Sequence, residues 1–380
     1  MEGQNKRIFK SVLIIFASII ILADACLILM HDKKFSENEN RTLSQFPEAT
    51  ASSLISGKFM SDAENFVADQ FFLRDSWISL KFLADKYTGR ENSNGVWLGF
   101  GNYLFENPTN PNMDTLKKNV NAIKSFAASR KANIYMTLVP NAITILDQLH
   151  PSYTPLYDQN FSIAYVKDHL VENITFVDIT DILKAHKYEN IYYKSDHHWT
   201  SLGAKYAFEV LSDVMHITPV KEYDLLEATD SFKGTMASTS GNFFVKDKIF
   251  LYIPKTSDFA YVVENTDMQQ KSATMYSSAA LQTKSKYDVF FGGNFPLINI
   301  KTTNNNSRNL VIFKDSFANA FVQFLIPYFE TITLVDARYY SDDIEKLLTN
   351  ASATDILFLY GANTFVADNY LADVLLDVEK

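Results

Sequence analysis

Three ionisable side chains stand side by side in the segment SDHHWT, residues 195–200. In an extended or turning backbone, residues two apart point to the same side, so Asp196 and His198 are expected to face one way and His197 the other. An Asp beside a His can accept the Nδ1–H of the ring and orient it, which leaves Nε2 free as a general base. A solvated loop histidine, or a structural histidine packed on Trp199, is the alternative.

A general base of this kind needs a nucleophile, and the segment NLVIFKDS, residues 309–316, offers one. An apolar strand is predicted to end at Lys314-Asp315-Ser316, and a helix is predicted to begin at Phe317. A serine at a strand-to-helix turn lies beside free backbone N–H groups, which can hold a developing oxyanion. The alternative is that Asp315 or Ser316 only caps the helix.

Two further places could belong to the same site. Gly293 and Asn294 follow the apolar run DVFF and are candidates for oxyanion binding, because glycine permits close approach and an Asn amide can donate. A simple turn is the alternative there. Arg338 follows the predicted strand 331–337 and is expected to line the same cleft, where it would bind an anionic or sugar group.

The elements that must position these residues read as strands alternating with helices. Helices are predicted in 51–88, from a cap at Asp114, and over 201–215, and a hairpin is predicted in 94–106. Short apolar strands are predicted at 133–140, 174–179, 288–294, 309–316, 331–337 and 355–362. Nearly continuous apolar strands separated by helices predict a mostly parallel sheet covered on both faces, with functional residues at the carboxyl ends of the strands.

The N-terminal segment carries a separate signal. Ser11–Met30 is an apolar run of about the length that spans a bilayer, and Lys6, Arg7 and Lys10 precede it. Basic residues before such a run favour a cytoplasmic N-terminus, which places the rest of the chain outside. We interpret the run as an uncleaved transmembrane anchor, with a signal peptide and a buried core helix as the alternatives.

The predicted domain organisation has three parts. Residues 1–34 form a cytoplasmic stub and membrane anchor, and residues 35–110 form a stalk, helices and a hairpin. Residues 111–380 form the candidate catalytic domain, with an insertion or flap near 220–287, where Ser, Thr and Lys are frequent. The single cysteine, Cys26, lies inside the apolar run, so the exported part is expected to have no disulfide and no cysteine metal ligand.

Composition limits the classes of function. The 380 residues are 47% hydrophobic, which is typical of a folded chain that can bury a core. The formal net charge is −9 and the chain has no long basic run, so nucleic acid is not the expected partner. No bound cofactor and no metal are expected.

The quartet DHHW, Asp196–Trp199, resembles the signature of the DHHW protein family, and the segment FSENENRTLSQFP, residues 35–47, is similar to the usual opening of that group. The resemblance covers about residues 35–365. Such proteins resemble the extracytoplasmic O-acetyltransferases of alginate and other exopolysaccharides. The resemblance implies an SGNH-hydrolase-like, flavodoxin-like α/β fold with a mostly parallel sheet flanked by helices.

The same resemblance implies roles for individual residues. Ser316 would be the nucleophile, His198 the base and Asp196 its orienting acid, while Gly293 and Asn294 would be oxyanion candidates. In this group the Asp-x-His pair precedes the serine, as it does here. One departure is that the usual Gly-Asp-Ser is Lys-Asp-Ser at 314–316, which changes the turn next to the nucleophile.

The expected function is therefore that of a membrane-anchored, extracytoplasmic carbohydrate O-acetyltransferase or acetylesterase. Its substrate would be a cell-surface or exported polysaccharide, and the chemistry would pass through an acyl-enzyme. The resemblance also implies that a membrane acyl-transfer protein supplies the acetyl donor outside the membrane.

Two other functions are compatible with the same residues. A non-catalytic polysaccharide-binding or assembly protein could use the same fold, with some of the 30 Phe and 20 Tyr as sugar platforms. A metal-dependent phosphoesterase could use Asp196-His197-His198 as ligands, with Asp178 and Asp181 added.

Overall fold

The computed structural model describes residues 2–219, 222–255, 259–367 and 370–376, and the chain divides into two compact units. Unit 1 is Met1–Arg90 with Gly241–Phe243, and unit 2 is Glu91–Ser240 with Phe244–Lys380. The helices and strands of unit 1 are α1 (Glu2–Leu29), β1 (Phe35–Ser36), β2 (Arg41–Thr42), α2 (Ala51–Ile55), α3 (Lys58–Gln70) and α4 (Arg74–Tyr87).

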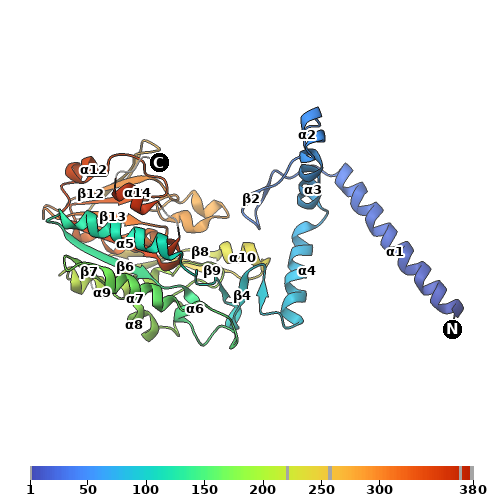
Figure 1. Ribbon diagram of the computed structural model, residues 1–380, viewed down its shortest axis with the longest axis horizontal. Helices are drawn as coiled ribbons and strands as arrows, with labels where there is room; N and C mark the ends of the chain where they lie inside the picture. The colour runs from blue at the N-terminus through green and yellow to red at the C-terminus, as the bar shows by residue number, and fades with distance from the viewer. Residues whose placement is uncertain (1, 220–221, 256–258, 368–369, 377–380) are drawn as a thin grey trace. The chain divides into compact units, whose positions relative to one another are not determined.

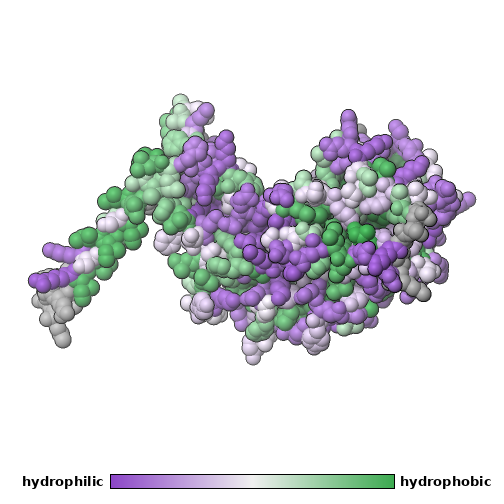
Figure 2. All heavy atoms as spheres, turned by 180° about the vertical axis from the view of Figure 1, so that it is seen from behind, coloured by the Kyte–Doolittle hydropathy of each residue, from purple (hydrophilic) through white to green (hydrophobic). Residues whose placement is uncertain are grey.

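Helix α1 contains the one stretch of the described residues that is long and apolar enough to cross a membrane, Arg7–Leu29. Figure 2 shows the greater part of this helix in green, the colour of hydrophobic residues. A signal sequence near an N-terminus has the same length and composition, so the helix identifies a candidate span and no more.

The remainder of unit 1 is held together by ionic contacts around Asp69 in α3, which is 8% exposed. Arg41 donates to both carboxylate oxygens of Asp69, and the Ser44 N–H donates to its Oδ2 at 2.8 Å. The hydrogen bonds from Arg41 hold the pKa of Asp69 well below its usual value. Asp69 is therefore a charged group that stabilises this unit by being ionised.

Unit 2 is a mixed α/β fold built on an eight-stranded sheet (Figure 1). Its strand order is β11-β10-β12-β14-β13-β15-β6-β7, with β14 to β7 parallel and the three strands at the other end antiparallel. The bounds are β6 (Asn133–Val139), β7 (Ile174–Phe176), β10 (Tyr261–Asn265), β11 (Gln270–Ser272), β12 (Leu297–Thr302), β13 (Asn309–Lys314), β14 (Thr331–Val335) and β15 (Asp355–Gly361). The prediction of a large, mostly parallel sheet is confirmed.

Two small sheets accompany the large one. They are a three-stranded sheet of β3 (Asn92–Ser93), β4 (Val96–Leu98) and β5 (Leu104–Phe105), and a two-stranded sheet of β8 (Tyr223–Phe232) and β9 (Asp247–Pro254). The helices of unit 2 are α5 (Met113–Ala128), α6 (Ala142–Ile145), α7 (Gln159–His169), α8 (Thr180–Ala185), α9 (Ser201–Val214), α10 (Thr235–Ser240), α11 (Phe317–Phe321), α12 (Ile344–Ala351), α13 (Ala362–Val366) and α14 (Leu371–Leu375). Short 3-10 turns are η1 (Phe100–Asn102), η2 (Ala280–Gln282), η3 (Lys286–Val289), η4 (Val322–Phe324) and η5 (Ile326–Tyr328).

Helices cover both faces of the parallel part of the sheet, because alternate residues of the same strands enter two separate cores. In β13, Val311 and Phe313 belong to the core to which α5, α12 and α14 contribute, whereas Leu310 and Ile312 belong to the core to which α8, α9 and α11 contribute. This double coverage explains why the middle strands are almost uninterrupted apolar runs. It also leaves the ends of the strands as the places where polar side chains can gather.

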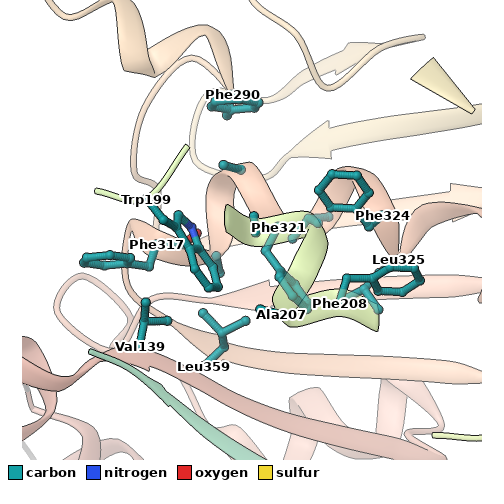
Figure 3. Packing of buried hydrophobic residues seen from close by; sticks show 14 of the residues in the cluster. Val139, Trp199, Ala207, Phe208, Phe290, Phe317, Phe321, Phe324, Leu325 and Leu359 are labelled. Atoms are coloured by element: carbon teal, nitrogen blue, oxygen red, sulfur yellow. The ribbon is translucent and has the colours of Figure 1, made fainter. Parts of the chain in front are cut away.

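The core beside the predicted site is aromatic (Figure 3). Trp199 is fully buried, stacks on Phe321 with ring centroids 5.8 Å apart, and donates its indole N–H to the carbonyl of Phe317 at 3.0 Å. Phe208 of α9 stacks in turn on Phe324. Trp199 therefore ties the segment that carries the two histidines to the turn that carries Ser316.

Two local predictions differ from the structure. The run 288–294 is not a strand: η3 ends at Val289, and Phe290 makes only an isolated bridge to Tyr276. Positive φ angles at three successive residues, Phe291 to Gly293, prevent strand geometry there. Helix α5 is capped by Asn112 rather than by Asp114.

The predicted insertion near 220–287 contains β8 and β9 together with β10 and β11 of the large sheet. Residues 220–221 and 256–258 of this stretch lie outside the described residues. The three-part domain division stays a prediction.

Candidate functional site

Three residues far apart in the sequence form a hydrogen-bonded chain. Ser316 begins α11 directly after β13, and His198 precedes α9, whose first turn is capped by Thr200. His198 Nε2 lies 2.7 Å from Ser316 Oγ, and His198 Nδ1 lies 2.5 Å from Asp196 Oδ1. The structure thus brings together the serine, histidine and aspartate that the sequence had singled out.

The Asp196 carboxylate determines which atom donates in each of these hydrogen bonds. Asp196 and His198 are 3% and 5% exposed, and a carboxylate can only accept, so Nδ1 carries the proton. Burial by itself would raise the pKa of Asp196, but the two neighbouring histidines and the Thr235 N–H outweigh burial and lower it. His198 Nε2 is then the acceptor for the Ser316 hydroxyl, which is the arrangement of a general base and its nucleophile.

Asp196 is held from the far side by a segment that no local pattern of residues predicted to lie there. Its Oδ2 accepts from the Thr235 N–H at 2.8 Å and from Thr235 Oγ1 at 3.1 Å. A Cβ added to Gly234 would lie 2.2 Å from the Cβ of Asp196. Only glycine therefore fits at 234, and the GTMASTSG stretch of the predicted flap supports the site directly.

A second buried acid fixes the start of the histidine segment. Asp247 accepts from the backbone N–H of Ser195 at 2.8 Å, from its hydroxyl at 2.5 Å and from the Lys194 N–H at 3.0 Å. Burial raises the pKa of Asp247, and the Ser195 bonds oppose that shift. These contacts set the backbone that enters Asp196 without involving a reacting atom.

Tyr287 is a site residue that the sequence did not indicate. Its ring stacks on His198 with centroids 4.0 Å apart and a 12° interplanar angle, and its hydroxyl donates to the Ser316 carbonyl at 3.1 Å. It comes from η3, far from both partners in the sequence. A single tyrosine among 20 carries no local signal, so only the folded contacts reveal it.

His197 turns toward other partners than His198 does. Its Nδ1 lies 2.9 Å from Thr235 Oγ1, and burial together with the nearby His198 lowers its pKa. Glu106 interacts electrostatically with His197 and accepts from Asn141 Nδ2 at 3.3 Å. Burial raises the pKa of Glu106. Like Asp247, Glu106 is an acid beside the site that sequence reasoning missed.

The capping alternative for Ser316 is resolved by its neighbour. Asp315 accepts from the Phe317 N–H at 2.9 Å and from the Gly361 N–H at 2.8 Å, whereas the Ser316 side chain makes no cap bond. Asp315 thus fixes the turn and joins β13 to the end of β15. The Ser316 hydroxyl is left to His198, and the Ser316 N–H has no acceptor among the described residues.

Gly293 and Asn294 lie beside the turn that carries Ser316. Gly293 has a φ of +131°, a conformation that L side chains rarely adopt. Asn294 Oδ1 accepts from Lys314 Nζ at 3.2 Å and from Asn319 Nδ2 at 3.1 Å. The Asn294 carboxamide is therefore fixed from the side of β13 and α11.

Arg338 follows β14 and is engaged with a buried acid. Its Nε and Nη2 donate to the two oxygens of Asp336 at 2.8 and 2.6 Å, and Asp336 is fully buried. An arginine in a two-pronged ion pair has less freedom to bind a substrate. A substrate-binding role for Arg338 stays a prediction.

The ligand atoms of Asp196, His197 and His198 all lie within 4.8 Å of one another, so a metal ion is chemically conceivable there. Both Asp196 oxygens and His198 Nδ1 already carry hydrogen bonds that a metal would have to break. Asp178, one of the two further ligands considered from the sequence, instead accepts from the Thr180 N–H and faces Lys167 at 3.7 Å. The geometry suits the hydrogen-bonded chain better than a metal centre.

A cavity of about 1190 Å³ lies over the antiparallel end of the sheet. It is lined mainly by polar residues of β10, β12, β14 and α12, among them Asn299, Lys301, Thr333 and Lys346. None of the predicted site residues is part of its lining. The candidate chemistry and this cavity are therefore separate features of unit 2.

A family model described as DHHW protein matches residues 84–335. A DHHW family protein from Eubacterium siraeum is 24% identical, with a TM-score of 0.65 over 76% of this chain and 97% of that one. Bacillus cereus PatB1, solved with a sulfonyl adduct, is 20% identical, with a TM-score of 0.61 over 73% and 96%. No curated protein matches the chain. At these identities the solved structures establish the shared fold.

Proposed function

The chain belongs to the DHHW family, and we propose that it is a serine O-acyltransferase or esterase that moves an acetyl group through an acyl-enzyme on Ser316. The observation that carries the proposal is the continuous chain from Ser316 Oγ through His198 to Asp196, with separations of 2.7 and 2.5 Å. Hydroxyl, base and orienting acid at hydrogen-bond distance are what nucleophilic catalysis by serine requires.

In the first half of the reaction, Ser316 Oγ attacks the carbonyl carbon of an acetyl ester while its proton passes to His198 Nε2. The tetrahedral intermediate collapses, the C–O bond to the donor breaks, and His198 returns the proton to the leaving oxygen. In the second half, a sugar hydroxyl or water attacks the acetyl-serine and passes its proton to His198. The bond between the acetyl carbon and Ser316 Oγ then breaks, and His198 returns the proton to Oγ. Asp196 stabilises the imidazolium in both halves.

The oxyanion of each intermediate needs donors. The Ser316 N–H, which has no acceptor among the described residues, and the amide of Asn294 are the groups that we assign to it. Gly293, with its positive φ, gives the backbone before Asn294 a conformation that glycine adopts without strain. An SGNH-hydrolase-like description of the fold goes with these assignments, supported by an Asp-x-His segment and a strand-end serine on a mostly parallel sheet.

The acceptor that we propose is a hydroxyl of a cell-surface or exported polysaccharide, on the basis of the family resemblance. The apolar helix α1 would anchor the chain in the membrane, with the folded part outside. Because no activated acetyl donor is expected outside the membrane, a membrane acyl-transfer protein would supply the acetyl group.

The test is release of nitrophenol from p-nitrophenyl acetate by the full chain in detergent, with and without EDTA. Ser316→Ala and His198→Ala are the variants, and an oligosaccharide acceptor is added to separate transfer from hydrolysis. Activity that survives EDTA and is lost in both variants is expected. Activity lost in EDTA would favour a metal-dependent enzyme, and activity unchanged in Ser316→Ala would overturn the nucleophile.

A further inference from the structure

Lys314 is a buried lysine two residues before the nucleophile. It ends β13 and is 1% exposed. Its Nζ lies 2.8 Å from Asn319 Oδ1, 3.2 Å from Asn294 Oδ1 and 3.7 Å from Asp336 Oδ2. An ammonium group in such a place costs free energy of desolvation, which Asp336 offsets only in part. Packing alone would be served as well by an apolar side chain of similar length.

The ammonium group decides which way two amides point. Lysine only donates, so the amide atoms facing Nζ must be the oxygens of Asn294 and Asn319. With its oxygen on Lys314, Asn319 presents its NH₂ to Asn294 Oδ1 at 3.1 Å. Both contacts converge on one Asn294 oxygen, and the Asn294 NH₂ must face away from this pair of donors.

The outward-facing NH₂ has no protein acceptor among the described residues, and Asn294 is only half-buried. Asn319 also connects this cluster to the nucleophile, because its backbone N–H donates to the Ser316 carbonyl at 3.2 Å. The donor that an oxyanion needs is therefore available next to the Ser316 turn, in an orientation that Lys314 imposes.

We propose that Lys314 is a positioning residue: its ammonium holds the carboxamide of Asn294 so that the NH₂ can donate to the oxyanion formed on attack by Ser316. This inference rests on the proposed acyl-transfer function. Without the ammonium, the Asn294 amide can rotate and present its oxygen, which repels the same oxyanion. Lys-Asp-Ser in place of the usual Gly-Asp-Ser is then a working part of the site.

The experiment is a double-mutant cycle of Lys314→Met and Asn294→Ala in the full chain, measured as kcat and KM for p-nitrophenyl acetate. Loss of one oxyanion donor is expected to lower kcat by about 10²-fold with little change in KM. Because Lys314 acts through Asn294, the double variant is expected to lose no more than Asn294→Ala alone. If Lys314 had only a structural role, the fold-losses in kcat of the two single variants would multiply in the double variant.

Arg308→Met is the matched control, since Arg308 is the cation at the amino end of the same strand. It donates to Asp355, which is 1% exposed, through Nη2 at 2.9 Å and Nε at 3.3 Å. Its loss is expected to lower the melting temperature while kcat of the folded protein stays within about threefold, the spread expected from independent sites.

The outcomes separate the inference from the proposed function. If Ser316→Ala keeps its activity, the proposed function fails. If Ser316→Ala is inactive but Lys314→Met keeps kcat within threefold of wild type, or the losses multiply, the positioning role is overturned. Should Lys314→Met not fold, Lys314→Gln replaces it, because a neutral amide can accept as well as donate and no longer forces the Asn294 oxygen toward position 314. A wild-type kcat in Lys314→Gln would then contradict the role, and a loss that the Asn294→Ala change does not add to would support it.

Discussion

The contact between Gly234 and Asp196 offers a perturbation whose size can be worked out from the structure. In Gly234→Ala the new methyl group would lie 2.2 Å from the Asp196 Cβ and 2.3 Å from its Oδ2, whereas ordinary contacts begin at 3.4 Å. One of the two segments must therefore move by about 1 Å in a closely packed site. The Asp196–His198 bond of 2.5 Å cannot survive such a shift unchanged.

A misplacement of about 1 Å in a catalytic group costs about 10²-fold in rate, and we expect a loss of that order in kcat. Overpacking should also lower the free energy of unfolding by about 1–3 kcal/mol. The assay is the acetyl-ester turnover of wild type and Gly234→Ala at equal folded concentration, with thermal unfolding followed in parallel.

Gly95→Ala is the control for this prediction. Gly95 has a φ of +86° and nothing within 4 Å of an added Cβ, so the change strains the backbone without pressing on the site. It should cost about 1 kcal/mol of stability and leave turnover as it is. Wild-type turnover in Gly234→Ala, with an unchanged melting temperature, would refute the view that Gly234 sets the position of Asp196.

Three further predictions concern stability. Because Arg41 lowers the pKa of Asp69, the ionised Asp69 stabilises the folded protein at pH values above the ordinary pKa of 3.8, and this stabilisation is lost as the pH falls. Asp69→Asn should therefore melt at a lower temperature than wild type at pH 7, and the two melting temperatures should converge in acid. Burial raises the pKa of Glu106, so the contribution of this group to the stability of the folded protein is complete below pH 4.5 and is lost as the pH rises. Glu106→Gln should therefore melt above wild type at pH 7 and near it at pH 4, and the reverse order would contradict this. Trp199→Phe removes the indole donor to the Phe317 carbonyl and should cost about 2–3 kcal/mol in denaturant unfolding; a cost below 0.5 kcal/mol, about the size of a surface change, would show that the bond matters little.

The parts of the site that could be predicted from the sequence are those encoded locally. Asp196 and His198 are two residues apart, so their pairing follows from backbone geometry alone. The position of Ser316 follows from the buried run of β13 and the helix behind it. The large parallel sheet was predictable for the same reason, since strands covered on both faces read as continuous apolar runs.

What the sequence could not provide depends on contacts between distant segments. Thr235 reaches Asp196 from a stretch whose composition indicated a flap, and Tyr287 reaches His198 from a short 3-10 turn. The predicted strand at 288–294 failed because apolar content alone does not reveal positive φ angles, at Phe291 among them. The partners of Lys314 were equally hidden, because two of them, Asn294 and Asp336, lie in other segments of the chain.

The measurement that tests the central claim most directly is the mass of the protein after brief reaction with p-nitrophenyl acetate and an acid quench. A sulfonyl fluoride, which reacts with activated serine hydroxyls, is a second probe of Ser316. We predict one added acetyl group, located on the peptide that contains Ser316, and none in Ser316→Ala. An acetyl group on another residue, or an unmodified Ser316 in a protein that turns over the ester, would contradict the account.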